Sequence, residues 1–390
     1  MRDRLHVLIV TPWYPSAYRP QNGVLCREQA RMLAERADVD LIFIESVSPK
    51  HLLSLLFGPK ARDEEEDGVR IHHRRILSLE RVSPGAAAFL NARAAARAYR
   101  RVVKLSGRPD VIHGHVTFPG GYAACRLGAR EHLPVVVTEH ASFFDLFMRN
   151  KRRYMLYALG RADCYTAVGS VLAAKVSRYT RRPCLTLPNF IDTVRFRGAA
   201  RPAFSPEGPF VLISIALMKP VKRLDLLLSA VAILRGQGQD VRALLLGDGV
   251  TRPALEKQAT DLGIAGAVTF TGLQDNQQLP AYFARAHLLV IASDVETFGI
   301  TGVEAMAAGV PVLSTACGGP EDYVTPETGL IVAAGSAEAL AEGILQMRDK
   351  YLSYPPETLR DYAAAHFGKE AVVHKLMDIY SACMAKNQEE

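Results

Sequence analysis

The sequence predicts an α/β protein with two doubly wound domains, each built on a parallel sheet with helices on both faces. Short, continuous runs of Val, Ile and Leu alternate with stretches of helical periodicity throughout the chain, as expected for strands that helices bury on both sides. These runs fall into two series, and a stretch rich in Gly, Pro and Arg separates them. The length of 390 residues also exceeds a single ordinary core.

The first series has strand candidates at 6–10, 39–44, 69–74, 111–113, 135–138 and 164–167, and the second at 210–215, 242–246, 268–271, 288–291 and 312–314. The segment between the two series, RFRGAARPAFSPEGP, has the composition of a linker. We therefore predict a first domain over 1–195, a linker over 196–207 and a second domain over 208–363. The tail over 364–390 has helical periodicity, and we expect its helix to cross back onto the first domain.

The composition is that of a soluble enzyme, with 49% hydrophobic and 22% charged residues. No apolar run approaches the roughly 18 residues that a membrane span needs. The apolar run at 5–10 is too short for the core of a signal peptide. The six cysteines are scattered, without the spacing of zinc or redox motifs. We therefore expect a cytoplasmic protein.

Much of the net charge of +7 comes from two basic segments in the first domain. Their cations are Arg93, Arg97, Arg100, Arg101 and Lys104 in the first segment and Arg149, Lys151, Arg152, Arg153 and Arg161 in the second. With the apolar run at 52–57, these segments predict peripheral contact with an anionic membrane at its inner face. A solvated basic surface is an equal alternative, and we expect no nucleic-acid partner.

The stretch 293–312, SDVETFGITGVEAMAAGVPV, follows a predicted strand and carries most of the functional argument. We expect a helix over 300–308, which places Glu296 in the strand-to-helix loop and Glu304 about one turn inside the helix. Gly299 lets a ligand approach the backbone closely. The first amides of the helix form an anion site that suits a diphosphate. An ordinary loop with solvated glutamates is the alternative.

This string matches, without a gap, the pattern Glu-x-Phe-Gly-x-x-x-x-Glu-Ala-Met-Ala-x-Gly-x-Pro-Val, and so resembles the signature of family 4 of the retaining glycosyltransferases. The resemblance implies the GT-B fold, in which two Rossmann-like domains face a central cleft. It implies that Glu304 binds the ribose hydroxyls of the donor and that Glu296 contacts the transferred sugar. The amides expected to hold the sugar and diphosphate are those of Phe298, Gly299, Ile300 and Thr301.

The segment ALMKPVKRLD at 216–225 resembles the family pattern Gly-Arg-Leu-x-x-x-Lys-Gly-x-Asp. Lys222 matches the lysine that neutralises the leaving diphosphate. Leu217, however, stands where the family has a phosphate-binding arginine, and Lys219 or Arg223 are candidates to replace it. A surface lysine at a helix start is the alternative for Lys222, although its charge would oppose the helix dipole.

Three further residues resemble family positions more loosely. Gly247, in the string GDG, resembles a Gly-x-Gly turn beside the donor. Gly23 precedes a predicted helix and resembles a glycine loop near the donor phosphates, with a simple turn as the alternative. His140 directly follows a predicted strand and resembles a histidine near the reaction centre, with a turn-capping histidine as the alternative.

Two strings suggest metals, and we interpret neither as a metal site. The string DVD at 38–40 has the DxD pattern of another glycosyltransferase fold, but it straddles the start of a predicted strand and is interpreted as structural. The string HGH at 113–115 has no Cys, Asp or Glu nearby in sequence to complete a zinc set, and we expect it to line the cleft. We predict no bound metal and no cofactor besides the donor substrate.

The sequence thus predicts a retaining glycosyltransferase that moves a sugar from a nucleoside-diphosphate sugar to a hydroxyl of a glycan or lipid-linked acceptor. Glu296, Lys222 and His140 are expected at the reaction centre. A nucleotide-sugar epimerase or a glycan phosphorylase of the same fold is the alternative, and Leu217 keeps a non-catalytic homologue open. A dinucleotide-dependent oxidoreductase is disfavoured because no GxGxxG string follows a strand.

Overall fold

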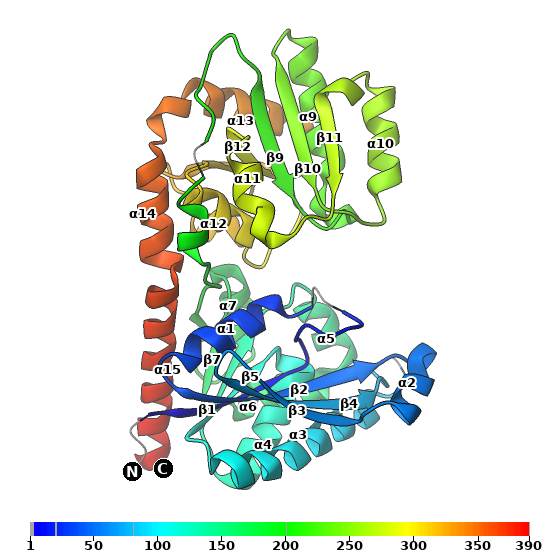
Figure 1. The fold of residues 1–390 in the computed structure, drawn as a ribbon, viewed down its shortest axis with the longest axis vertical. Helices are drawn as coiled ribbons and strands as arrows, with labels where there is room; N and C mark the ends of the chain where they lie inside the picture. Colours follow the sequence, from blue (N-terminus) through cyan, green and yellow to red (C-terminus); the bar gives the residue numbers. More distant parts are fainter. Residues whose placement is uncertain (1–3, 20–21, 81, 200, 390) are drawn as a thin grey trace. The chain divides into compact units, whose positions relative to one another are not determined.

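The computed structural model describes residues 4–19, 22–80, 82–199 and 201–389. The chain divides into two compact units (Figure 1). Unit 1 comprises Met1–Pro188 and Val373–Glu390, and unit 2 comprises Asn189–Val372. No helix within the described ranges is both long enough and apolar enough to cross a bilayer.

The boundary between the units lies after Pro188, ahead of the expected domain end at 195. The short helix α8 (Thr193–Phe196) explains the difference, because it packs against helices α12 and α14 of unit 2. The boundary near the C-terminus lies inside helix α15 (Lys369–Glu389), whose residues from Val373 onwards belong to unit 1. The expected linker includes Ala200, which lies outside the described residues.

The centre of unit 1 is a sheet with the strand order β3-β4-β2-β1-β5-β6-β7-β8. Its strands are β1 (His6–Thr11), β2 (Asp38–Val47), β3 (Ala61–Glu66), β4 (Val69–Leu77), β5 (Val111–His115), β6 (Val135–Glu139), β7 (Cys164–Ala167) and β8 (Leu185–Thr186). Neighbouring strands are parallel except β3, which runs antiparallel to β4. Because β5 lies between β1 and β6, the carboxyl ends of these three strands lie side by side.

Helices cover both faces of this sheet (Figure 1). They are α1 (Val24–Ala34), α2 (Leu52–Phe57), α3 (Pro84–Ser106), α4 (Tyr122–Glu131), α5 (Phe144–Asn150), α6 (Arg152–Arg161) and α7 (Ser170–Ser177). Helix α1 packs on β2 and β4, while α3 and α4 pack against each other on the opposite face. Within unit 1, α15 is anchored by Tyr380, which is fully buried and whose Oη lies 2.7 Å from His113 Nδ1.

The centre of unit 2 is a parallel sheet with the strand order β11-β10-β9-β12-β13-β14. Its strands are β9 (Phe210–Ile215), β10 (Val241–Leu246), β11 (Val268–Gly272), β12 (Leu288–Ile291), β13 (Val312–Thr315) and β14 (Gly329–Val332). Its helices are α9 (Leu224–Gly236), α10 (Arg252–Asp261), α11 (Leu279–Phe283), α12 (Ile300–Ala307), α13 (Ala337–Asp349) and α14 (Pro356–Phe367), besides α8. Helices α9 and α13 pack together, and α12 packs on α14.

The sequence prediction missed β3, β8 and β14, and its all-parallel sheet is wrong for the edge strand β3. This strand, ARDEEE, is mostly exposed and has almost no apolar side chains, so no hydrophobic pattern marks it. Antiparallel pairing with β4 defines it instead. Strand β8 has only two residues, and β14 begins at a glycine, Gly329.

The DxD string of the first domain is structural, as expected. Asp40 is fully buried within unit 1, where its carboxylate binds two histidines, His6 Nε2 at 2.8 Å and His72 Nε2 at 2.7 Å. Arg70 Nη2 and Ser106 Oγ complete its surroundings at 3.1 and 3.2 Å. Burial by itself would raise the pKa of Asp40, but the hydrogen bonds from His6, His72 and Arg70 hold this pKa well below its usual range.

We predict that Asp40→Asn lowers the free energy of unfolding by about 3 kcal/mol at pH 7, because it breaks a buried charge network. A carboxyl with a lowered folded-state pKa stabilises the fold above its unfolded pKa, near 4, and this stabilisation is lost as the pH falls further. The difference between wild type and variant should therefore shrink below about pH 4. Urea unfolding across this pH range measures it.

The matched control is Asp38→Asn, which changes the other carboxylate of the same DxD string. Asp38 is half-buried and forms no ion pair among the described residues. We expect it to change the free energy of unfolding by less than about 0.5 kcal/mol. Equal losses for the two variants would contradict the assignment of Asp40 as the centre of the network.

Candidate active site

The signature loop of unit 2 connects β12 to α12 and ends in a sharp turn at Gly299. Gly299 has a φ of +75°, a left-handed conformation that favours glycine, and α12 begins at the next residue. Tyr323 closes the turn by donating its hydroxyl to Gly299 O at 2.6 Å. A Cβ on Gly302 would approach the Tyr323 hydroxyl to 2.3 Å, so this position of the helix must also lack a side chain.

The turn presents backbone amides at the start of α12. The amides of Gly299, Ile300 and Thr301 open the helix, where no preceding turn supplies acceptors. They therefore form an anion-binding position at the positive end of the helix dipole. The Phe298 side chain is 2% exposed and packs against the rings of Tyr323 and Phe367, so Phe298 anchors the loop in the core.

Glu304 lies on α12 and is buried, with 7% of its surface exposed. Burial raises the pKa of its carboxyl to about 7, against the opposing effect of the nearby Arg195 guanidinium. Arg195 Nη2 lies 3.3 Å from Glu304 Oε1. A carboxylate with one cationic partner keeps acceptor positions for the hydroxyl groups of a ligand.

Arg195 is the site residue that the sequence analysis missed. It belongs to the short helix α8, whose first amides, those of Val194 and Arg195, bind Asp192 Oδ1 at 3.1 and 3.3 Å. Its guanidinium lies over the Phe196 ring, 4.6 Å from the ring centroid, and its Nε is buried without a hydrogen-bond partner. The only sequence signal was the capping aspartate, which marks a helix within a segment that otherwise resembles a linker.

The structure brings Lys222 and Glu296 together. Lys222 Nζ lies 2.5 Å from Glu296 Oε1, and the Ser293 hydroxyl donates to the same oxygen at 2.8 Å. The Glu296 backbone is held on both sides, because its amide donates to Cys317 O at 2.8 Å and its carbonyl accepts from Gly319 N at 3.0 Å. Glu296 is thus fixed in position between two loops.

The loop after β9 distinguishes the two candidates that could replace the arginine missing at Leu217. Leu217 is half exposed, and Arg223, at a φ of +48°, leads into α9. The Arg223 guanidinium is already bound by Asp225 at 3.1 Å and by Asp294 at 3.2 Å. Of the two suggested replacements, only Lys219 is exposed without an ion pair among the described residues.

Gly247 lies at the carboxyl end of β10, where two loops interlock. It has a φ of +127°, and a Cβ there would come within 1.9 Å of Ala216 O. The loops are joined by backbone hydrogen bonds from Ala216 N to Leu246 O and from Met218 N to Asp248 O, at 3.0 and 2.9 Å. Glycine is required so that the loop after β9 can pack against the loop after β10.

The other two predicted residues, Gly23 and His140, lie in unit 1 and share a neighbour. Gly23 has a φ of +72° and precedes α1, and a Cβ there would come within 2.2 Å of the Trp13 backbone. His140 follows β6, and its ring centroid lies 6.4 Å from that of Trp13. Trp13 therefore brings the two positions together, although they are far apart in the sequence.

Buried polar groups fix the loop that carries His140. The Glu139 carboxylate accepts from the amides of Thr117, His140 and Ala141 at 3.0, 2.8 and 2.8 Å. The pKa of Glu139 is nevertheless raised, because the effect of burial exceeds the lowering effect of these hydrogen bonds. Burial also lowers the pKa of His140 to about 4, so its imidazole is neutral at pH 7.

The interpretation of the HGH string as cleft lining is wrong, because both histidines are fully buried. His113 Nδ1 contacts Tyr380 Oη and its Nε2 contacts Thr138 Oγ1, each at 2.7 Å, so it is a core residue. His115 Nδ1 lies 2.9 Å from His140 Nε2. His115 therefore packs beneath the loop that carries His140 and contacts its ring.

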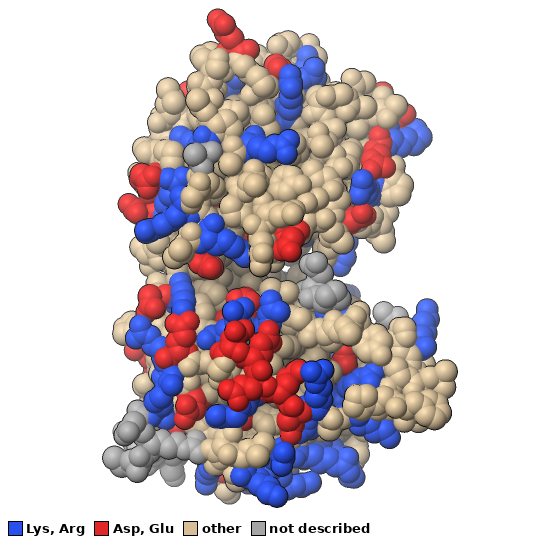
Figure 2. All heavy atoms as spheres, viewed as in Figure 1, with Lys and Arg blue, Asp and Glu red and all other residues tan. Residues whose placement is uncertain are grey.

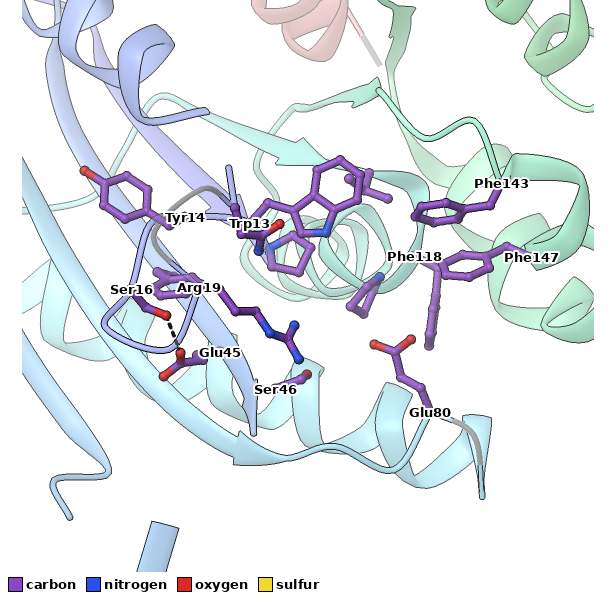
Figure 3. A pocket seen from close by; sticks show the side chains of 15 residues that line it. Trp13, Tyr14, Ser16, Arg19, Glu45, Ser46, Glu80, Phe118, Phe143 and Phe147 are labelled. Atoms are coloured by element: carbon purple, nitrogen blue, oxygen red, sulfur yellow. Dashed lines mark hydrogen bonds between the residues drawn. The ribbon is translucent and has the colours of Figure 1, made fainter. Parts of the chain in front are cut away.

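A pocket of unit 1 opens beside Trp13 (Figure 3). Its lining combines aromatic rings with polar side chains, namely Trp13, Tyr14, Phe43, Phe118, Phe143 and Phe147 with Ser16, Arg19, Asn22, Glu45, Ser46 and Glu80. The three phenylalanines of the labelled set lie together on one side, and Arg19 and Ser46 lie on the other (Figure 3). Such a lining suits a ligand with both apolar faces and hydroxyl groups.

Lys151 does not belong to the exposed basic surface that the sequence predicted. It is buried, its Nζ lies 2.8 Å from Glu80 Oε2 and 3.6 Å from the Phe147 ring centroid, and it therefore shapes the pocket wall. The other expected cations of the segment 147–161 are exposed.

Two family models match the chain, one for each unit. The model described as "Glycosyltransferase Family 4" matches residues 23–195, and the model described as "Glycosyl transferases group 1" matches residues 199–364. The chain belongs to the group 1 glycosyltransferase family. The second match contains Lys222, Gly247, Glu296 and Glu304, and the first contains Gly23 and His140.

Two relatives illustrate this membership, and one solved structure shares the fold. A D-inositol 3-phosphate glycosyltransferase of Streptomyces coelicolor is 33% identical over 48% of this chain and 44% of its own length. The lipopolysaccharide core biosynthesis glycosyltransferase LpsE of Rhizobium meliloti is 31% identical over 56% of this chain and 64% of its own length. HepE of Anabaena, solved with UDP and glucose, is 17% identical, with a TM-score of 0.71 over 97% of this chain and 100% of its own.

The chain thus spans about half to two thirds of these relatives. The solved structure shows the fold alone, two Rossmann-like units of the GT-B type.

We predict that the ionisation of Glu304 destabilises unit 2. Because its folded-state pKa of about 7 lies above the usual value near 4.5, the folded chain binds more protons between these values. The free energy of unfolding should therefore fall by about 3 kcal/mol as the pH rises from 5 to 8. Glu304→Gln should lack this loss, so that it gains stability relative to wild type at pH 8.

Urea unfolding from pH 5 to 8 measures this effect, with the exposed Glu342→Gln on α13 as the matched control. Arg195→Met should move the fall in stability to higher pH, because it removes the cation beside Glu304. Parallel pH profiles for wild type and Glu304→Gln would show that the Glu304 carboxyl does not titrate in this range.

Proposed function

We propose that the chain transfers a sugar from a nucleoside-diphosphate sugar to an acceptor hydroxyl with retention of the anomeric configuration. The observation that carries this proposal is the ion pair of Lys222 with Glu296, placed beside the amides that open α12. A cation and a helix start suit the diphosphate, and a fixed carboxylate suits the hydroxyls of a sugar. HepE, solved with UDP and glucose, supports a nucleotide-sugar donor.

The difficult step is the departure of the diphosphate. The bond from the anomeric carbon to the phosphate oxygen breaks while the acceptor oxygen forms a bond on the same face. The acceptor proton passes to an oxygen of the leaving phosphate. Lys222 and the amides of Gly299 and Ile300 stabilise the negative charge that develops there, and because the fold already holds them in place, no reorganisation is needed.

Glu304 serves the nucleotide rather than the reacting sugar. A vicinal diol of ribose offers two hydroxyl donors, and the buried carboxylate offers acceptor positions that Arg195 leaves open. His140, neutral at pH 7, offers the sugar an uncharged hydrogen-bonding group.

The acceptor is proposed to bind in the aromatic pocket of unit 1. Sugar rings have apolar faces that pack on aromatic side chains, while their hydroxyls bond to Arg19, Glu45 and Glu80. A glycan or lipid-linked glycan has this chemistry, and the relatives that act on inositol phosphate and in lipopolysaccharide core synthesis support it.

We predict that Glu304→Ala weakens donor binding about 10–100-fold, because it removes charge-assisted hydrogen bonds of about 1.5–3 kcal/mol. Glu296→Gln should instead lower kcat and leave the donor Kd nearly unchanged, since its contacts are to the reacting sugar. A thermal-shift screen with UDP-, GDP- and ADP-sugars identifies the donor, and its Kd is then measured for each variant.

Product analysis with a labelled donor tests the reaction itself. Retention appears as the same anomeric configuration in the donor and the product. Free epimer, or a requirement for inorganic phosphate, would identify an epimerase or a phosphorylase instead. A chain that binds no nucleotide sugar in the screen would refute the transferase.

We also propose that unit 1 attaches peripherally to the inner face of an anionic membrane. Helix α2 exposes four apolar side chains, with exposed fractions of 41% for Leu52, 70% for Leu53, 54% for Leu56 and 85% for Phe57. Arg75 fixes this helix by donating to Ser54 O at 2.8 Å. Figure 2 shows an uncharged surface over α2 with Lys and Arg side chains beside it.

Vesicle pelleting tests the attachment. We expect binding to phosphatidylglycerol vesicles that falls with salt, since the basic contribution is screened. Leu53→Glu should weaken binding about tenfold or more, because it removes apolar burial. The matched control is Leu352→Glu, which changes an equally exposed leucine of unit 2. Absence of pelleting at low salt would contradict the proposal.

A further inference from the structure

Three potential metal ligands of unit 1 meet at the carboxyl edge of its sheet. Cys26 lies in the first turn of α1, which follows β1. His115 ends β5, and His140 follows β6. Because β1, β5 and β6 are neighbours in the sheet, the thiol sulfur and one nitrogen of each ring lie within 4.8 Å of one another.

A second observation points to a missing ligand at this cluster. His115 is fully buried, and its Nδ1 lies 2.9 Å from His140 Nε2, but its Nε2 has no hydrogen-bond partner. The neighbouring His113, equally buried, has both ring nitrogens in hydrogen bonds. Leaving a buried polar atom unpaired costs about 1–3 kcal/mol, so something that bonds to this nitrogen would stabilise the cluster.

We propose that Cys26, His115 and His140 form a site for a divalent transition metal of the Zn²⁺ type. One thiolate and two imidazoles are ligands that zinc prefers, and three protein ligands leave a fourth position open to water or substrate. His140 is half-buried, whereas Cys26 and His115 are buried, so the open position faces the side of His140.

The cluster has to adjust before it can bind one ion. Bond lengths of about 2.0–2.3 Å place tetrahedral ligand atoms roughly 3.3–3.6 Å apart. The ligand atoms of the cluster lie within 4.8 Å of one another and have to approach to this spacing. The Cys26 thiol loses its proton to solvent as the sulfur–metal bond forms, so one proton is released for each ion bound.

The site shares His140 with the proposed transfer reaction, and this consequence rests on the proposed function. An imidazole nitrogen bound to a metal is no longer available to a sugar hydroxyl. The ion should therefore inhibit glycosyl transfer, and the inhibition should need Cys26.

Cobalt titration of the chelator-treated full chain tests the site without any nucleotide sugar. We expect one Co²⁺ per chain, with visible d–d bands of a tetrahedral site and a thiolate-to-cobalt charge-transfer band. Cys26→Ser should abolish the charge-transfer band and lower the affinity by more than about 100-fold. The matched control is Cys125→Ser, which changes another buried cysteine of unit 1 and should bind like wild type.

His115→Gln provides a second variant, which should lose the visible bands while it keeps Cys26. Circular dichroism and thermal unfolding verify that each variant is folded. Absence of the charge-transfer band in wild type would overturn the proposal, and so would an unchanged band in folded Cys26→Ser. Because no donor is present, this failure would leave the transferase proposal untouched.

A zinc titration of transferase activity then tests the consequence. Zn²⁺ should inhibit the wild type and Cys125→Ser at similar concentrations, and Cys26→Ser should require more than about 100-fold more zinc. Equal inhibition of all three proteins would refute the link between the site and His140.

Discussion

The Lys222–Glu296 ion pair is the contact on which the arrangement of the signature loop in unit 2 depends. It joins the loop after β9 to the loop after β12, and a backbone hydrogen bond from Asp294 N to Val221 O, at 2.8 Å, joins the same loops beside it. An exposed ion pair contributes little, but here both side chains are largely shielded and the backbone is held on either side. The cation and the carboxylate are therefore in place before a ligand arrives.

Two buried carboxylates show how the number of partners decides the behaviour of a charge. Asp40 is surrounded by His6, His72, Arg70 and a serine hydroxyl, and its pKa is lowered. Glu304 is also buried, but among the described residues Arg195 is its one charged partner, and its pKa is raised to about 7. The first is a structural hub, whereas the second is left with unused acceptor positions, a feature typical of functional sites.

In unit 1, adjacent parallel strands gather polar side chains that are distant in the sequence. The ends of β1, β5 and β6 place Trp13, His115 and His140 in contact, and α1 adds Cys26. The same neighbourhood borders the aromatic pocket, because Trp13 belongs to both. The proposed acceptor pocket and the proposed metal site would thus share one short stretch of the sheet edge.

The sequence by itself determined the α/β class, the strands with apolar runs and the loop that carries Glu296 and Glu304, because these features have local patterns. Hydrophobic continuity marks buried strands, and Gly299 with the following helix formers marks the turn before α12. The sequence could not identify the edge strand β3, because this strand is defined by its pairing with β4. Local patterns also could not show that Lys151 is buried and forms an ion pair with Glu80.

Only the tertiary structure decided which distant residues meet. Arg195 and Glu304 are separated by 109 positions, and no periodicity links a residue of an apparent linker to a helix of the signature loop. Cys26 likewise approaches the HGH string only because β1 and β5 are neighbours in the sheet. Contacts of this kind depend on strand order and loop packing, which arise from burial over the whole unit, so they become visible only once the chain is folded.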